Sequence, residues 1–527
     1  MFEAQSSTSS NRSSVLKIGG VIALGLIAVV VFYKSYGYRW LDNDSAHYDE
    51  LERHRAAQQQ QPDVLTAPAA PVVAQQPAPV VNAEQSAPGA PATTTSAPAQ
   101  AATAVESTGG GKPANAGASA SGAAQTAVLE ANHPTVKPAA AGRNYWTNFR
   151  GPNRDGHYDE SAVKTSWPSA GLKQAWKQPI GVGFASFVVA DGVAYTIEQR
   201  RKQEVVTAYN VETGRELWTH GWDALFTDST GDGPRATPTW DAGRIYAQGA
   251  AGELRCLDAK TGKLFWRRNI LSDSGADNLS WGMAGSPLVV DDKVIVLAGG
   301  GGGRSVAAYH KLTGAPVWKS QNDRASYTSP MLVNLGGRRQ VLLVSANRMF
   351  SLAPEDGSLL WSHPWETSMG INVSQPIIID KNHVFISAGY GKGASLVELQ
   401  PTSGGKFTAR SLWENINLKT KFNSPVYHNG HVYGLDEGIL ACVDAQTGER
   451  KWKGGRYGYG QLLVASGHLI VLTDTGELAL VKAEPSQFTE VAKFPAIQGK
   501  TWNVPAIAGG RLLVRNGNEM ACYSLTE

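Results

Sequence analysis

Four short stretches of the chain carry the residue types from which a binding site could be built. Each stretch comes just before an apolar run whose second residue is proline, as in Ser286-Pro287 and Ser424-Pro425. Carboxylate and amide oxygens suit a hard metal ion, cationic groups suit an anion, and tryptophan faces suit flat or apolar groups. The candidate site residues are Asp228, Asp232, Arg235, Asn278, Trp281, Lys421, Asn423 and Trp502.

These residue types do not form a recognisable catalytic set. No combination of serine, histidine and carboxylate with the spacing of a nucleophilic active site stands out in the sequence, and the histidines lack the spacing of metal ligands. We therefore predict no catalytic residues and no dedicated metal site.

An internal repeat must position the candidate residues. A Thr-Gly pair followed by tryptophan recurs, for example from Asp258 to Trp266 and from Asp444 to Trp452. The repeat length of about 45 residues is typical of four-stranded β-propeller blades. We expect each repeat tryptophan to pack between neighbouring blades, so that its loss would cost roughly 3 to 5 kcal/mol. The repeat tryptophans are Trp176, Trp218, Trp266, Trp318, Trp361, Trp413 and Trp452.

The repeats predict an all-β fold, an eight-bladed propeller of four-stranded antiparallel blades. The last repeat ends without its closing tryptophan, whereas Leu172–Lys177 resembles an orphan fourth strand that could pair with Met520–Ser524 and close the ring. Seven blades is the alternative, because the seventh repeat lacks Thr-Gly and Trp. The loops that enter the inner strands should ring one funnel-shaped face and carry the candidate residues there.

The N-terminal part of the chain predicts one transmembrane helix. Residues 18–33 contain no charge and lie between Lys17 and Lys34, and at 1.5 Å per residue they span roughly 24 Å. We divide the chain into a tail (1–16), a signal-anchor helix (17–34), a juxtamembrane segment (35–57), a linker (58–142) and the propeller (143–527). A cleaved signal peptide is the alternative, and the flanking charges leave the orientation open.

The linker at 58–142 is rich in Ala, Pro and Gln and contains no Trp, Tyr or Phe. Such a composition predicts disorder, because the segment cannot bury a core. As a coil its end-to-end distance would be roughly 50 Å. We expect it to act as a leash between the membrane and the propeller.

Charge and cysteine content narrow the function further. The 48 basic and 45 acidic residues leave a net charge of +3, which argues against a nucleic-acid partner. Cys256, Cys442 and Cys522 fall at one register of three repeats and are predicted to be small buried strand residues. No spacing favours structural zinc or covalent haem.

The repeats resemble those of the PQQ-like (quinoprotein alcohol dehydrogenase-like) β-propeller family, most clearly at Asp258–Trp266 and Asp444–Trp452. The stretch Asn148–Gly156, followed by Trp167-Pro168, is similar to a bacterial subgroup grouped with BamB-type outer-membrane assembly factors. The resemblance covers nearly all of residues 146–527. The resemblance implies the propeller fold. It does not decide the function, because the same fold occurs in both enzymes and scaffolds.

The resemblance implies two functions. Our leading prediction is a non-enzymatic, protein-binding scaffold without a cofactor, anchored in the bacterial inner membrane with the propeller in the periplasm or outside the cell. Its partners would be envelope proteins or extended peptides, in outer-membrane protein assembly. The alternative is a dehydrogenase of alcohols or sugars that uses PQQ and calcium, although the adjacent cysteines common in such enzymes do not occur here. A purely structural spacer is a third possibility.

Overall fold

The computed structural model describes residues 38–60 and 146–526, with side chains described from Ser45 onward in the first range. The predicted transmembrane helix at 17–34, the tail before it and the linker from residue 61 onward lie outside the described residues. Within the described ranges, no helix is both long enough and apolar enough to cross a membrane. Residues Tyr38–Gln60 form a single helix, α2.

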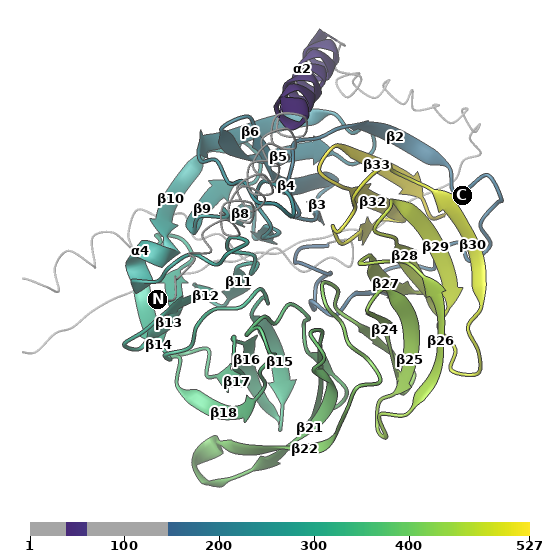
Figure 1. Cartoon of the computed structure of the whole chain (residues 1–527). Helices are drawn as coiled ribbons and strands as arrows, with labels where there is room; N and C mark the ends of the chain where they lie inside the picture. The colour runs from purple at the N-terminus through teal and green to yellow at the C-terminus, as the bar shows by residue number, and fades with distance from the viewer. Residues whose placement is uncertain (1–37, 61–145, 527) are drawn as a thin grey trace, which may run out of the picture. The chain divides into compact units, whose positions relative to one another are not determined.

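Residues 146–526 form eight antiparallel sheets arranged as the blades of one propeller (Figure 1). The first blade contains β3 (Val188–Ala190), β4 (Val193–Arg200), β5 (Gln203–Asn210) and β6 (Glu216–Asp223). The second contains β7 (Thr239–Asp241), β8 (Arg244–Gln248), β9 (Glu253–Asp258) and β10 (Leu264–Asn269). The third contains β11 (Leu288–Val290), β12 (Lys293–Gly300), β13 (Arg304–His310) and β14 (Pro316–Ser320). The short helix α4 (Ile270–Ser274) joins the second and third blades.

The next four blades follow the same order. The fourth contains β15 (Met331–Leu335), β16 (Arg338–Val344), β17 (Arg348–Leu352) and β18 (Leu359–Pro364). The fifth contains β19 (Ile377–Ile378), β20 (His383–Ala388), β21 (Gly393–Pro401) and β22 (Phe407–Asn415), with the 3-10 turn η3 (Ser403–Gly405) between the last two. The sixth contains β23 (Val426–His428), β24 (His431–Asp436), β25 (Ile439–Asp444) and β26 (Arg450–Arg456). The seventh contains β27 (Gln461–Ala465), β28 (His468–Leu472), β29 (Glu477–Lys482) and β30 (Glu490–Pro495).

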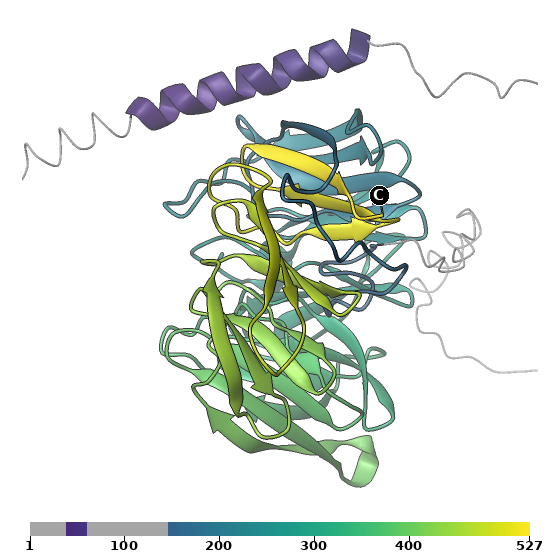
Figure 2. The same cartoon turned by 90° about the vertical axis from the view of Figure 1, so that its right-hand side faces the viewer.

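The eighth blade closes the ring by joining the two ends of the propeller. It contains β31 (Ala506–Ala508), β32 (Arg511–Arg515), β33 (Glu519–Ser524) and, as its outer strand, β2 (Gln174–Pro179). Trp176 lies opposite Cys522 in this pairing, and the yellow and blue strands meet here in Figures 1 and 2. The prediction of eight blades closed by an N-terminal strand is confirmed, and seven blades is excluded.

The repeat tryptophan explains the glycine of the Thr-Gly turn. Trp218 of the first blade donates a hydrogen bond from its indole nitrogen to the Ala259 carbonyl of the second blade, at 3.0 Å. Its ring lies over Gly262, where φ is +71° and a Cβ atom would come within 2.5 Å of the ring. Only glycine tolerates both the backbone angle and the contact. The predicted packing between blades is therefore confirmed at this position.

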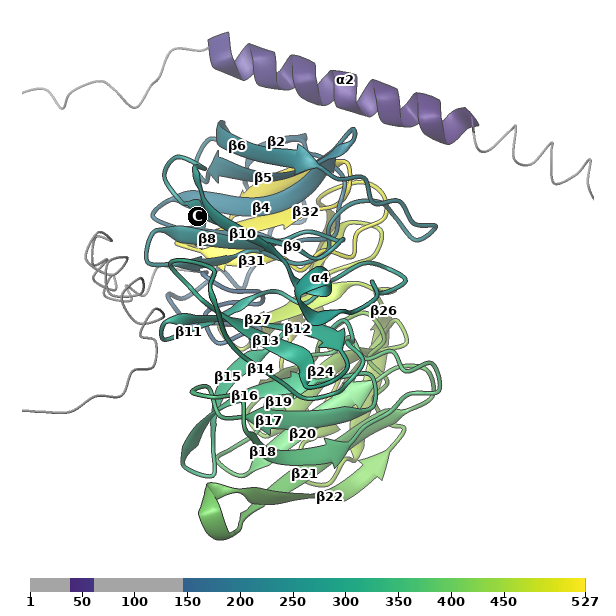
Figure 3. The ribbon, with the colours of Figure 1, turned by 90° about the vertical axis from the view of Figure 1, so that its left-hand side faces the viewer.

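Two blades depart from the repeat. The indole nitrogen of Trp361 donates to Gln340 of its own blade at 2.8 Å, because the next blade has the longer hairpin of β21 and β22 in place of a Thr-Gly turn. This hairpin lies at the rim of the ring in Figures 1 and 3. The seventh blade gains a fifth strand, since β1 (His157–Tyr158) pairs in parallel with β27.

The three cysteines lie as the sequence predicts. Cys256, Cys442 and Cys522 are free and buried in β9, β25 and β33, and each faces a repeat tryptophan across the strand pair. Burial raises the pKa of the Cys256 thiol to about 11. These thiols are packing residues, remote from redox chemistry at neutral pH.

The segment before the first blade contributes two buried arginines, which we call the arginine pin. Arg150 and Arg154 are 1% and 2% exposed. Arg154 donates to the carbonyl oxygens of Ser286 at 3.1 Å and Pro330 at 2.9 Å, whereas Arg150 donates to that of Pro425 at 2.8 Å. These acceptors precede the inner strands of the third, fourth and sixth blades, so the pin links blades that do not share strands.

Candidate functional site

The loops that enter the inner strands surround one central cavity. The cavity encloses about 950 Å³, part of it open to solvent, and Phe149 of the segment that carries the arginine pin forms part of its lining. Every blade contributes at least one lining residue, which confirms the predicted ring of loops. One lining residue from each blade, in order, is Phe184, Arg235, Trp281, Tyr327, Val373, Phe422, Gln461 and Trp502.

Three of the eight candidate residues, Arg235, Trp281 and Trp502, line this cavity. Trp281 is half-buried, and its ring centroid lies 5.4 Å from that of Tyr327. Arg235 lies over the ring of Phe226, with 4.6 Å between its Cζ atom and the ring centroid. Burial lowers the pKa of the Arg235 guanidinium to about 10. Of the predicted site residues, the structure therefore brings one cation and two indole rings to the cavity.

The two carboxylates of the Asp228–Arg235 loop hold the loop itself. The Oδ1 atom of Asp228 accepts a hydrogen bond from the backbone nitrogen of Thr230 at 2.7 Å. The Oδ1 atom of Asp232 accepts from the backbone nitrogen of Asp228 at 3.0 Å. A guanidinium nitrogen of Arg235 lies 4.0 Å from the Asp228 carboxylate, so a cation already faces these oxygens. Asp228 and Asp232 are turn residues whose oxygens accept hydrogen bonds from the backbone of their own loop.

The two predicted asparagines do not converge with the carboxylates. Asn423 is buried and pairs with the backbone of Leu435, donating to its carbonyl and accepting from its nitrogen, both at 3.3 Å. Asn278 is exposed. Among the described residues, no group of three or more His, Cys, Asp or Glu side chains is arranged to hold a metal ion.

Aromatic rings from the loops of four blades contact one another at the cavity, and we call Phe184, Phe422, Tyr459 and Trp502 the aromatic funnel. The ring centroid of Trp502 lies 5.7 Å from that of Phe184 and 5.1 Å from that of Phe422, with both pairs stacked. Tyr459 meets the ring of Phe422 edge-on at 5.0 Å. Stacked and edge-on pairs of this kind are the favourable aromatic geometries.

Two lysines lie over this funnel. The ammonium of Lys500 lies 3.7 Å from the ring centroid of Trp502, and that of Lys421 lies 5.3 Å from the centroids of both Phe422 and Tyr459. Partial burial lowers the pKa of Lys500. Ammonium groups at these distances are attracted to the ring faces and remain able to bind an anion.

Sequence reasoning found Lys421 and Trp502 and missed Lys500, Phe184 and Phe422. Phe422 and Lys500 lie within two positions of a predicted residue, and Phe184 lies in the loop that enters β3. Treating every inner loop alike, instead of selecting polar residues, would have found them. The site can bind anionic and aromatic groups, whereas its carboxylates serve the loop that carries them.

Comparison with known proteins places the chain beside two kinds of propeller. Residues 201–454 match the family model described as outer membrane protein assembly factor BamB. A quinoprotein ethanol dehydrogenase from Pseudomonas aeruginosa is 32% identical over 171 residues, which cover 29% of this chain and 26% of that protein. A 1-butanol dehydrogenase (cytochrome c) from Thauera butanivorans is 30% identical over 114 residues, covering 21% and 16%. The chain thus spans about a quarter or less of these curated relatives.

Comparison with solved structures gives matches at low sequence identity. The quinohemoprotein alcohol dehydrogenase from Comamonas testosteroni matches with a TM-score of 0.50 and 16% identity over 76% of this chain and 84% of that one. BamB from Moraxella catarrhalis matches with a TM-score of 0.49 and 17% identity over 67% and 98%. Repeat, fold and sequence similarity agree: the chain resembles the PQQ-like-repeat β-propellers, with likeness to both BamB and the quinoprotein dehydrogenases.

Proposed function

We propose that the protein is a non-enzymatic, protein-binding scaffold of the bacterial cell envelope, and that the aromatic funnel binds an extended segment of an envelope protein. The observation that carries the proposal is the pairing of stacked rings with Lys421 and Lys500 at the cavity. The family match to an outer-membrane assembly factor supports a role in the assembly of outer-membrane proteins.

The funnel has the composition of a protein-binding surface. Tryptophan, tyrosine and arginine dominate the residues that contribute most to protein interfaces. The half-buried rings of Trp281 and Trp502 offer apolar area, and Lys421 and Lys500 offer charge for acidic side chains or a terminal carboxylate. A peptide segment can use both features at once.

The location of the propeller belongs to the same proposal. The apolar segment at 17–34 would anchor the chain in the inner membrane, with the propeller in the periplasm or outside the cell. The charges on its two sides are equal and do not decide the orientation. We infer a cytoplasmic N-terminus from the short tail before the segment and the tether after it.

A quinone-dependent dehydrogenase is the second candidate, favoured by the names of the two curated relatives. The residues of this chain do not fit its calcium ion. Asp228 and Asp232 accept hydrogen bonds from their own loop and face Arg235, and Asn278 is exposed. A planar, anionic quinone would suit the cations and rings of the funnel, so the test must include one.

A photo-crosslinking amino acid at Tyr327 tests the scaffold. In the full chain, expressed in bacteria, we expect a crosslink to an envelope protein that weakens at least tenfold in the K421E/K500E variant. The K482E variant, which changes an exposed lysine of β29, is the matched control. A synthetic peptide spanning the crosslinked segment should compete with the crosslink. A crosslink that persists unchanged in K421E/K500E would contradict the proposal.

Titration of the purified full chain tests the dehydrogenase as the second candidate. The chain is titrated with PQQ in the presence and absence of calcium, while tryptophan fluorescence reports binding and an artificial electron acceptor reports alcohol oxidation. Calcium-dependent binding together with turnover would replace the scaffold by the dehydrogenase.

A further inference from the structure

We propose that α2 is an intramolecular docking helix whose binding site is the outer edge of the first blade. Docking would hold the propeller beside the segment that precedes Tyr38, so that residues 61–145 begin and end on the same body. This inference concerns how the propeller is held and is independent of what the funnel binds.

One face of α2 is buried although the helix is mostly polar. Tyr48 and Leu51 are 7% and 3% exposed, and with Arg55 they follow the spacing of a single helix face. The hydroxyl of Tyr48 donates to the Gln199 carbonyl at 3.3 Å. His47 lies next to them, with its Nε2 atom 2.8 Å from the Ile180 carbonyl oxygen.

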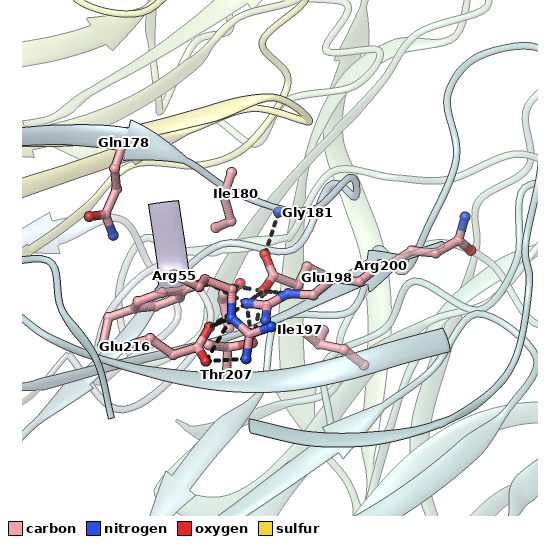
Figure 4. Close-up of polar contacts among 12 residues, drawn as sticks. Arg55, Gln178, Ile180, Gly181, Ile197, Glu198, Arg200, Thr207 and Glu216 are labelled. Carbon is pink, nitrogen blue, oxygen red and sulfur yellow. Dashed lines mark hydrogen bonds and ion pairs between the residues drawn. The ribbon is translucent and has the colours of Figure 1, made fainter. Parts of the chain in front are cut away.

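A row of alternating charges runs from the interior of the first blade to α2 (Figure 4). Glu198 is fully buried and accepts hydrogen bonds from Arg200 and from the Gly181 backbone nitrogen. Arg200 also donates to Glu216 at 2.8 Å. Two nitrogens of Arg55 in turn donate hydrogen bonds to the Glu216 carboxylate, at 2.6 and 2.9 Å. Bidentate pairs of this kind require one specific placement of the helix.

The helix also covers an open strand edge. β6 is the outermost strand of its blade, and the backbone nitrogen of Glu216 donates to the side-chain oxygen of Gln58 at 3.2 Å. The amide nitrogen of Gln58 donates to Gln178 of β2 at 2.8 Å. Gln58 therefore bridges the first and eighth blades, at the point where the ring closes.

A second ion pair lies farther out on the same helix. Arg201 contacts Asp49 at 2.7 Å and Glu52 at 3.0 Å, and its Cζ atom lies 5.8 Å from the ring centroid of Tyr48. Among the side chains of α2 that are described, from Ser45 onward, the buried apolar ones are Tyr48 and Leu51. Charge pairs and backbone groups therefore make up most of this described contact. Such a contact is specific and sensitive to salt.

Docking changes the role predicted for the linker. The predicted anchor ends at residue 34 and α2 begins at Tyr38, which leaves three residues between them. If α2 is docked, the distance from the anchor to the propeller is set by α2, and the residues from 61 to 145 no longer separate the two.

Cleavage of the linker tests the docking in the full chain. A protease site is inserted between Thr108 and Gly109, and the cut protein in detergent is separated by size. We expect the N-terminal fragment to elute with the propeller and to be lost, at least tenfold, in the R55E variant. R53E is the matched control, because Arg53 is exposed and, among the described residues, donates to the backbone of its own helix and not to the propeller. If the two fragments of the cleaved parent protein, without any charge substitution, elute separately, the proposal is overturned.

A charge exchange separates docking from misfolding. E52R and R201E should each reduce retention of the fragment. The combined E52R/R201E chain should restore part of it, because Asp49 also faces position 201. Hydrogen exchange of the uncut chain provides a second readout, in which R55E should raise exchange at residues 48–58 and leave the blades unchanged. Equal exchange in R55E and R53E would also overturn the proposal.

Discussion

Two groups of cations near the centre of the ring are held in opposite ways. The arginine pin is almost completely buried, and its donors are bound by carbonyl oxygens that belong to several blades. Lys421 and Lys500 lie over aromatic rings. Lys500 donates one hydrogen bond to the Thr230 carbonyl, and an ammonium group has three hydrogen atoms, so others remain for a ligand. The difference separates cations that hold the blades together from cations that are available for binding.

The largest effect should come from breaking the pin. We expect Arg154→Met to lower the free energy of unfolding by roughly 3 to 5 kcal/mol, because several buried carbonyl oxygens lose their donor at once. Denaturation with urea measures the change. Lys500→Met removes one exposed hydrogen bond, to the Thr230 carbonyl, and should stay within about 1 kcal/mol of the parent. Equal losses in the two variants would abolish the distinction between the two groups.

Two tryptophans sharpen the comparison. Trp218→Ala removes a buried indole between two blades, and we expect it to lower the free energy of unfolding by roughly 3 to 5 kcal/mol. Trp502→Ala should lower it less, since Trp502 is half-buried, and should remove the funnel crosslink. Thermal unfolding and the crosslinking yield are measured on the same two proteins. A stable Trp502→Ala variant with an unchanged crosslink would speak against the funnel as the binding site.

Glu204 of β5 should make the free energy of unfolding depend on pH. Burial raises its pKa from the ordinary 4.5 to about 7, although its Oε1 atom accepts a hydrogen bond from the Ala250 nitrogen at 2.7 Å. Between pH 4.5 and 7 the folded protein keeps a proton that the unfolded chain releases, so the free energy of unfolding falls as the pH rises, by roughly 2 to 3 kcal/mol. Glu204→Gln should remove this fall, as urea titrations at pH 5 and pH 8 would show.

The smallest expected effect is at Lys421. Lys421→Gln removes attraction to the rings of Phe422 and Tyr459 and should change the free energy of unfolding by no more than about 1 kcal/mol. Its effect on funnel binding should be larger than its effect on stability. Parallel measurements of peptide affinity and urea midpoint check this, and a variant with lost stability and intact affinity would place Lys421 with the arginine pin.

The repeat made most of the fold predictable. The spacing of the tryptophans determined the eight blades, and the missing last tryptophan identified β2 as the partner of β33. The candidate site was predicted in part, because inner loops could be located but the contacts among them could not. The residue type and loop position of Asp228 indicate a possible ligand, and only the structure assigns its oxygen to the turn at Thr230.

Two features could not be predicted for a physical reason. The arginine pin and the docking of α2 both depend on contacts between residues more than one hundred positions apart, which leave no periodic pattern in the sequence. The stretch Asn148–Gly156 could be associated with a protein group by resemblance. Its contacts with several blades could not be predicted from the sequence. Residues 35–57 were predicted to be a juxtamembrane segment, and nothing in their spacing indicated a partner.

The arginine pin also constrains the order of folding. Arg154 finds its acceptors only when three different blades are in place, and β2 finds its partner only when the last blade has formed. Partly assembled blades would therefore leave a guanidinium without acceptors and a strand edge unpaired. Such long-range requirements slow folding and make it cooperative. The propeller should consequently unfold as one unit, with no stable arc of fewer than eight blades.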